Sequence, residues 1–196
     1  AAFAPGLPAI MAPEGVALRI PAGSKLAFQV HYTPNGSPQT DLCEAGLIFA
    51  DPDEVRHEVR VQAGLNFAFL IPPGAADYRV AAKYRVIDDT LLFSMTPHIN
   101  YPDGKRDILL DVPRYDFNWQ NIYLLKKPKH LPAGTIIDLD ASFDNSADNP
   151  LNPDPTQSVH WGDQTWQEMM IGTMGVSDYD PALEKSISQR IRAATN

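Results

Sequence analysis

Proline and glycine divide this chain into short segments, and that division limits the folds open to it. Eighteen prolines and twelve glycines are spread over 196 residues, and neither residue favours a helix interior. The runs between them alternate apolar and polar side chains with a period of two, which is the signature of β-strands. At about ten residues per strand and turn, this pattern predicts an all-β antiparallel sandwich.

The clearest alternation lies in the run from Lys25 to Thr33, which ends at the turn signal Pro34-Asn35-Gly36. Successive side chains of a strand point to opposite faces, so His31 is expected on the face opposite Phe28. The predicted strands cover residues 16–20, 25–33, 45–50, 55–62, 66–71, 78–87, 90–98, 106–112, 120–126 and 134–143.

The tail is the one segment with helical character. Asp180 suits an N-cap, Pro181 suits the first helical position, and residues 182–194 contain good helix formers. No linker or internal repeat interrupts the sequence. We therefore expect a single domain over residues 1–196, with an extended lead-in over 1–12 and a C-terminal helix over 181–194.

Composition restricts the partners of the chain. A hydrophobic fraction of 44% and a charged fraction of 20% are typical of a globular protein. The net charge of −8 is scattered, which argues against nucleic acid and anionic membranes as partners. No apolar run approaches the ~20 residues of a membrane span, so we expect no membrane insertion by this chain. The first residues lack a basic region and an initiator Met, which suggests a processed or trimmed piece of a longer protein.

The chain has a single cysteine, Cys43, so an internal disulfide is impossible. It begins an apolar run, where we expect it as a small buried side chain. The alternative is a bond to a segment outside this sequence.

The densest cluster of special residues runs from Phe143 to Met170. It contains Phe143-Asp144-Asn145-Ser146, several Asn-Pro and Asp-Pro pairs, Trp161-Gly162-Asp163 and Glu168-Met169-Met170. Short Asx side chains that bond nearby backbone are expected to shape this loop, and Trp161 and Trp166 to anchor it. Met170 is expected to fill the core.

Two residues combine the chemistry that a copper site requires. Imidazole suits copper and thioether sulfur favours its reduced state, so His98 and Met169 are the best pair of candidate ligands. The alternative for His98 is a strand-end histidine bonded to backbone or water, and for Met169 a place in the core. His57, in a charged run, and His130, in an expected exposed turn, receive no role.

The stretch that ends in Glu168-Met169, taken with Gln29-Val30-His31-Tyr32 and Pro97-His98-Ile99-Asn100, resembles the C-terminal half of the copper type II, ascorbate-dependent monooxygenases. That family includes peptidylglycine α-hydroxylating monooxygenase and dopamine β-monooxygenase, and the similarity is greatest to its bacterial relatives. It extends from about Pro13 to Met170. The resemblance implies a jelly-roll β-sandwich and an extracytoplasmic (periplasmic, secreted or lumenal) location.

The resemblance also implies a catalytic copper held by a His-x-His pair and one Met. His98 takes the first histidine position and Met169 the methionine position, but Asn100 stands where the second histidine belongs. An amide oxygen is a harder and weaker donor than imidazole for copper. If another histidine replaces that ligand, it is expected to be His160, nine residues before Met169.

His31 resembles one ligand of the family's second, electron-transfer copper. The other two histidines of that site belong to the family's N-terminal half, and this sequence contains no His-His pair. The resemblance therefore implies a partner, either an N-terminal copper domain or another protein chain, and reduction by ascorbate or another one-electron donor.

Two functions remain open at this point. The first is O2-dependent hydroxylation of a C–H bond at a His98–Met169 copper site. The second is a non-catalytic β-sandwich subunit or accessory domain of a larger extracytoplasmic complex, with the copper site lost at Asn100. The sequence contains no hydrolase nucleophile motif and no phosphate-binding loop.

Overall fold

A computed structural model describes residues 12–30, 32, 35–95, 98–100, 102–113 and 122–194, without the side chains of residues 98–100 and 190–194. This part is built mainly from β-strands and has one helix. The elements are β1 (Val16–Ala17), β2 (His57–Glu58), β3 (Arg60–Asn66), β4 (Leu70–Ile71), β5 (Tyr78–Arg85), β6 (Thr90–Met95), β7 (His98–Asn100), β8 (Arg106–Asp107), β9 (Tyr123–Leu131), β10 (Ile136–Phe143), β11 (Val159–His160), β12 (Met170–Asp178) and α1 (Pro181–Ala194).

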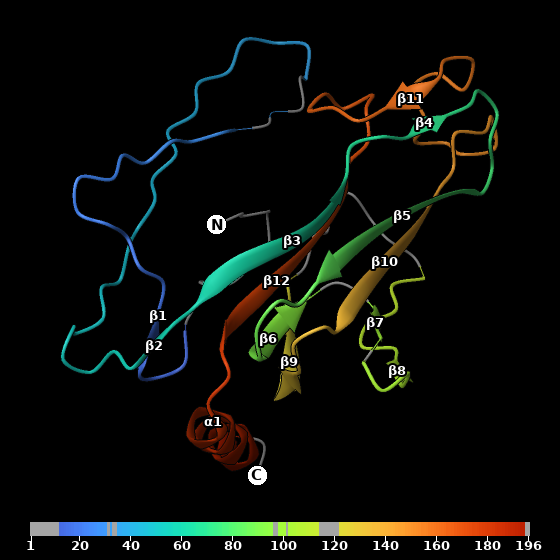
Figure 1. Cartoon of the computed structure of the whole chain (residues 1–196). Coiled ribbons are helices and arrows are strands. Elements are labelled where there is room, and N and C mark those ends of the chain that lie inside the picture. Colours follow the sequence, from blue (N-terminus) through green and yellow to red (C-terminus); the bar gives the residue numbers. More distant parts are fainter. Residues whose placement is uncertain are drawn as a thin grey trace.

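Two four-stranded antiparallel sheets form the body of the molecule (Figure 1). The strand order is β5-β10-β7-β8 in one and β3-β12-β6-β9 in the other. The described residues also form two separate two-stranded sheets, an antiparallel β4-β11 pair and a parallel β1-β2 pair. The prediction of a mostly β fold with antiparallel sheets is confirmed, whereas a jelly-roll connectivity stays a prediction.

The main core draws on both sheets. In β10, Ile137 and Leu139 are buried while Asp140 is exposed, which is the alternation expected of a strand with one apolar face. In β12, Met174 and Val176 are likewise buried on the apolar face of the strand. Each fully buried aliphatic side chain stabilises the fold by roughly 1.5–3 kcal/mol relative to an exposed one.

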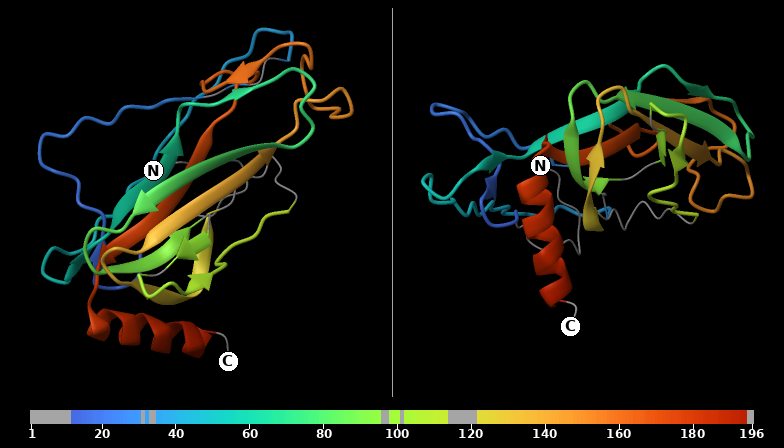
Figure 2. Two further views of the ribbon diagram at one scale, coloured as in Figure 1. Left: turned by 45° about the vertical axis from the view of Figure 1, so that its right-hand side comes forward. Right: turned by 60° about the horizontal axis from the view of Figure 1, so that its bottom comes forward.

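The C-terminal helix is confirmed and covers a second, smaller core at one end of the sheets (Figure 2). Asp180 is its N-cap, because the Asp180 Oδ1 accepts a hydrogen bond of 2.8 Å from the Ala182 N–H. Leu183 and Ile187 face inward, four residues apart on one side of the helix, and pack with Leu91 of β6. The β4-β11 pair lies at the opposite end of the molecule (Figure 1).

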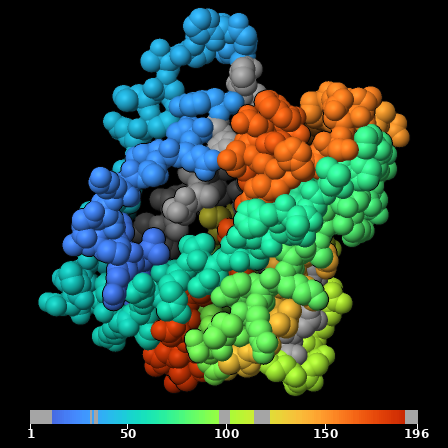
Figure 3. All heavy atoms as spheres, turned by 45° about the horizontal axis from the view of Figure 1, so that its top comes forward, coloured from blue at the N-terminus to red at the C-terminus, as the bar shows by residue number. Residues whose placement is uncertain are grey.

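The strands predicted over 25–33 and 45–50 are wrong for the residues that the structure describes. Residues 25–30, 32 and 45–50 form no strand, and the predicted strand 16–20 is reduced to Val16–Ala17. The segment between β1 and β2 forms an outer arc beside the packed body (Figure 3). The alternation is present, but a strand also needs a neighbouring backbone to pair with, and Phe28 is left 64% exposed.

Other strands also differ from expectation. The strand predicted over 120–126 is observed as β9 over Tyr123–Leu131, so Pro128 lies inside a strand. Pro128 is tolerated because β9 is at the edge of its sheet, where a missing N–H need not break a ladder. The pattern of the sequence also did not predict β12, which pairs with both β3 and β6.

Across the described residues, no helix combines the length and apolar character that crossing a membrane requires.

Candidate functional site

The predicted copper ligands are described to different degrees. His31 lies outside the described residues. The backbones of His98 and Asn100 lie in β7, where they pair with Asp138 and Ile136 of β10, and their side chains are outside the description. Whether His98 meets Met169 therefore stays a prediction.

Met169 is half-buried and directly precedes β12, whereas Met170 is 5% exposed within the main core. The expectation that Met170 fills the core is confirmed. Met169 is not among the residues that form the main core or pack against it. Its thioether is thus not needed for core packing.

A tight return of the chain brings His160 close to the Met169 segment. After β11, residues 162–167 loop back, so that Trp161 and Glu168 form a parallel bridge. The Glu168 N–H donates to the His160 carbonyl and the Gly162 N–H to the Glu168 carbonyl, each over 3.3 Å. The Gln167 N–H closes the loop by donating to the Gln164 carbonyl over 2.9 Å.

The imidazole of His160 is oriented by this backbone. Its Nδ1 lies 2.7 Å from the Trp161 carbonyl oxygen. A carbonyl oxygen can only accept, so Nδ1 carries the proton, and in the neutral ring Nε2 then keeps its lone pair. The residue is exposed. Histidines that bind metals through Nε2 are commonly fixed in this way, by an Nδ1–H bond to a backbone carbonyl.

Gly162 makes room for the side chain beside the histidine. A Cβ at position 162 would lie 1.9 Å from Gln167 Oε1, so an alanine cannot occupy this place while Gln167 stays where it is. Gln167 Oε1 accepts from the Gln164 N–H over 3.1 Å, and its Nε2 lies 3.5 Å from His160 Nε2. The sequence showed Trp161-Gly162-Asp163 as unusual but gave no reason for the glycine.

Aromatic packing holds the same loop on the body of the molecule. Trp161 is half-buried against the main core and meets Phe67 edge to face, with ring centroids 4.3 Å apart. Its predicted anchoring role is confirmed. The same prediction is wrong for Trp166, which is 60% exposed because it lies in the turn of the loop. Protein atoms around Glu168 raise the pKa of its carboxyl by desolvation, although much of the residue remains accessible.

The Asn-rich loop before β11 has the structural role that the sequence predicts. Asn145 is 4% exposed, and its amide nitrogen donates to the carbonyls of Pro72 and Gln157, each over 2.9 Å. Asn152 donates to the Asn145 side-chain oxygen over 2.9 Å. These bonds join the segments that flank β4 and β11 and so support the strand that carries His160.

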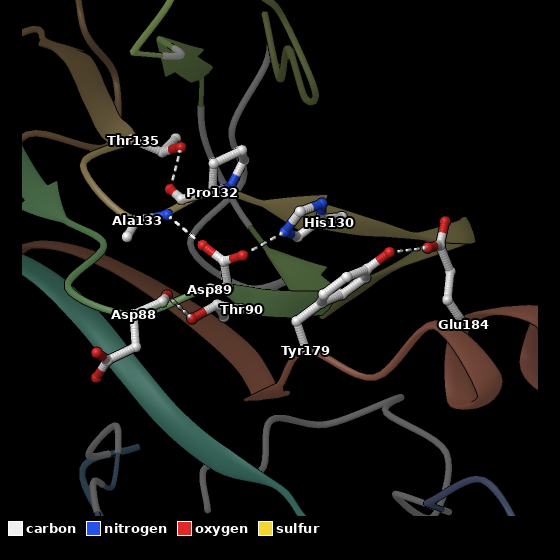
Figure 4. A network of polar contacts seen from close by, with 9 residues as sticks. All are labelled: Asp88, Asp89, Thr90, His130, Pro132, Ala133, Thr135, Tyr179 and Glu184. Atoms are coloured by element: carbon white, nitrogen blue, oxygen red, sulfur yellow. Dashed lines mark hydrogen bonds and ion pairs between the residues drawn. The ribbon is translucent and has the colours of Figure 1, made fainter.

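His130 belongs to a polar network at the base of α1 (Figure 4). Its ring stacks on Tyr179 at 3.6 Å between centroids, and its Nε2 lies 3.4 Å from an Asp89 carboxylate oxygen. The N–H of Ala133, and secondarily His130, lower the pKa of Asp89. The predicted exposed turn is therefore wrong, since His130 lies in β9, half-buried under Tyr179.

His57 also differs from expectation. Its Nε2 lies 3.2 Å from the carboxylate of Asp180, and its side chain is 22% exposed. The charged sequence around His57 predicted a solvated surface. That prediction is wrong, because β2 lies beside the start of α1. Both histidines thus lie where the helix attaches, His57 beside Asp180 and His130 against Tyr179.

Cys43 is exposed, so the prediction of a buried thiol is wrong. Its neighbours form no strand and give it no packed surface. The Cys43 thiol donates to Asp41 over 2.8 Å, and the Tyr32 hydroxyl donates to the same oxygen over 2.8 Å. The hydrogen bond that Cys43 donates to Asp41 raises the pKa of the Cys43 thiol. The hydrogen bond that Tyr32 donates to Asp41 raises the pKa of the Tyr32 hydroxyl to about 12.

Within the described residues, no three or more His, Cys, Asp or Glu side chains gather as a metal site. Reduced copper favours soft donors such as the thioether of Met169, together with imidazole nitrogen. That these residues hold copper stays a prediction. No protein-family model matches the sequence, and comparison with curated proteins finds no match.

Proposed function

We propose that this chain is the C-terminal, copper-binding domain of a copper type II monooxygenase-like protein, with a jelly-roll sandwich as its fold. The placement of Met169 is the observation that carries the proposal. It is a half-buried thioether directly before the central strand β12 and outside the main core, which its neighbour Met170 fills. A soft donor in an accessible position favours Cu(I).

His98 and Met169 would hold the metal. When bound, copper would supply the one-electron redox chemistry through which O2 hydroxylates a substrate C–H bond. The thioether of Met169 favours the reduced ion, and the imidazole of His98 adds a nitrogen donor. Asn100 contributes at most a weak oxygen donor, so the site depends on these two residues and on further donors nearby.

A second copper-bearing domain or chain is part of the proposal. The segment with strand-like alternation leaves Leu26, Phe28 and Val30 exposed and unpaired within the described residues. Exposed apolar rows of this kind mark surfaces that another protein covers. A partner beside His31 would complete the electron-transfer site, with ascorbate or another one-electron donor as the source of electrons, in an extracytoplasmic compartment.

A non-catalytic accessory domain is the second candidate. Asn100 favours it, because a site without the second histidine of the pair binds copper more weakly. In that case the exposed apolar segment would still dock a partner, and the chain would serve a larger complex through its surface.

Copper content separates the two candidates. The chain is loaded with Cu(I) under anaerobic conditions and analysed for metal, beside a Met169→Leu variant that keeps the side-chain volume. The monooxygenase-like proposal predicts about one copper per chain and its loss in the variant. No bound copper in either protein would favour the accessory domain, whereas equal copper in both would show that Met169 is not a ligand.

A further inference from the structure

We propose that the free edge of β3 is a dimerisation surface, on which a second copy of this chain adds its own β3 in antiparallel register. β3 is the end strand of its sheet, with β12 along one side and no described strand along the other (Figure 1). Such an edge presents a row of unpaired N–H and C=O groups on which another strand can pair. The inference concerns the surface of the sandwich and does not depend on copper.

The other three edges of the two large sheets have features that oppose strand addition. β5 presents exposed arginine and lysine side chains, and β8 is only two residues long. β9 contains Pro128 and three lysines. Charge, proline and shortness are the usual means by which proteins protect an edge. Over residues 61–65, with the sequence Val-Gln-Ala-Gly-Leu, β3 has none of them.

The backbone of β3 is oriented for pairing at this edge. Just before β3, the Val59 N–H donates to the Ala17 carbonyl of β1 over 2.9 Å. Backbone groups alternate between the two edges of a strand, so Val61, Ala63 and Leu65 direct their N–H and C=O groups as Val59 does. β1 ends at Ala17, and no described strand continues its pairing along β3. These backbone groups are therefore available to a second chain.

The side chains at the edge form an apolar row on the outer face of the sheet. A Cβ at Gly64 would meet Leu139 across the core, so Gly64 faces inward, and Val61 and Leu65 face outward. Val61 and Leu65 are 59% and 41% exposed. The row continues onto β12, where Ile171 pairs with Leu65 and is also exposed. A partner strand that covers this row needs uncharged side chains at the facing positions.

A second β3 meets that requirement, because the row has the same pattern in both directions. In an antiparallel pair centred on Ala63, Val61 of one copy lies opposite Leu65 of the other, and Ala63 lies opposite Ala63. Residues paired in this way exchange two backbone hydrogen bonds each. The small Ala63 side chains separate the two Val–Leu contacts. Since one two-fold axis relates the copies, the assembly closes as a dimer.

The test is the oligomeric state of the copper-free chain, measured by sedimentation equilibrium between about 1 μM and about 1 mM. We expect a monomer–dimer equilibrium. Val61→Lys should raise the dissociation constant of the dimer at least about tenfold, because it places a charge opposite Leu65 of the other copy. Ile87→Lys is the matched control, since Ile87 is 70% exposed outside β3, and its dimer should be as stable as that of the wild type.

A pair of opposite charges tests the register. Leu65→Glu alone should also weaken the dimer. The double variant Val61→Lys/Leu65→Glu should recover most of the loss, because antiparallel pairing sets the new cation of each copy opposite the new anion of the other. Hydrogen exchange is a second measurement. The N–H groups of Val61, Ala63 and Leu65 should exchange slowly in the wild-type dimer and quickly in Val61→Lys.

Three results would overturn the inference. They are a wild-type chain that stays monomeric over the whole concentration range, a dimer that Val61→Lys leaves intact, and a double variant as weak as the single variants. A monomer whose amides at 61–65 exchange slowly would show that another part of the same chain covers the edge, which also contradicts the inference. None of these results concerns copper binding, so the proposed function is tested separately.

Discussion

Met169 and Met170 are consecutive, yet only Met170 belongs to the main core. Met170 is 5% exposed there, and Met169 is half-buried directly before β12. The same residue type therefore has a core-packing role at one position and not at the next. This separation lets stability and metal affinity be tested independently.

Met170→Ala is expected to lower the free energy of unfolding by about 2–5 kcal/mol, because it leaves a cavity in the core. Met169→Ala is expected to cost less than about 1 kcal/mol in the metal-free chain, since Met169 is only half-buried. Urea denaturation of the two variants measures both effects. Equal losses would mean that Met169 is also a core residue.

Gly162→Ala is expected to destabilise the chain by about 1 kcal/mol at most, because the group it displaces is the end of the flexible Gln167 side chain. The new Cβ would meet the Gln167 side chain at 1.9 Å. Shortening that side chain in a Gly162→Ala/Gln167→Ala double variant should recover most of the loss, which a double-mutant cycle reports as coupling. Additive losses would show that the clash is with another group.

Asn145→Ala is expected to cost about 1–3 kcal/mol, because it removes a buried side chain that donates to the carbonyls of Pro72 and Gln157. Asn149→Ala in the same loop is the matched control. Asn149 also bonds a backbone carbonyl, that of Asp144, but this bond is exposed, so water can replace it at little cost. Thermal unfolding of the two variants shows whether the cost comes from the burial of Asn145 or from any Asn hydrogen bond in this loop. Equal shifts in Tm would contradict a role for burial.

Acid should weaken the contact between β3 and β12. The hydrogen bond from Arg60 holds the pKa of Asp178 below its usual value. A carboxyl whose folded pKa is depressed contributes stability that is fully present above the unfolded pKa of about 3.9 and is lost as pH falls through the folded pKa. In Asp178→Asn, stability should fall less steeply below about pH 4. An unchanged pH profile would show that the pair contributes nothing.

Cys43 should react slowly with alkylating reagents at neutral pH despite its exposure. The thiolate is the reactive form, and the bond to Asp41 raises the pKa of the thiol. Asp41→Asn removes that carboxylate and should speed alkylation at pH 7–8, whereas Asp53→Asn, another exposed carboxylate of the same segment, should not. The rates as a function of pH give the check. Identical alkylation rates in the wild-type protein and the two variants would contradict the hydrogen bond between Cys43 and Asp41.

Local signals predicted the parts of the fold that depend on local chemistry. The Asp180-Pro181 pair marked the start of α1, and plain alternation marked β5, β6 and β10. The sequence did not predict β12, because Gly172 and Gly175 interrupt its apolar pattern. Both glycines face paired strands there, and a Cβ at Gly175 would lie 2.6 Å from Ser94 Oγ.

The candidate site was also predictable only where residue chemistry alone points to it. The softness of a thioether singled out Met169 from residue type alone. The orientation of His160 depends on the Trp161 carbonyl and on the β4-β11 pair, which joins segments nearly ninety residues apart. No local pattern encodes such a pairing. Residues 25–30 and 32 show the converse: their side chains alternate along the chain, but no described strand pairs with them.

The most direct test of the copper proposal is X-ray absorption at the copper edge of the Cu(I)-loaded chain, compared with Met169→Leu. The account predicts one sulfur scatterer together with imidazole nitrogen in the wild-type chain, and loss of the sulfur in the variant. A spectrum with only nitrogen and oxygen neighbours, unchanged by the substitution, would contradict it.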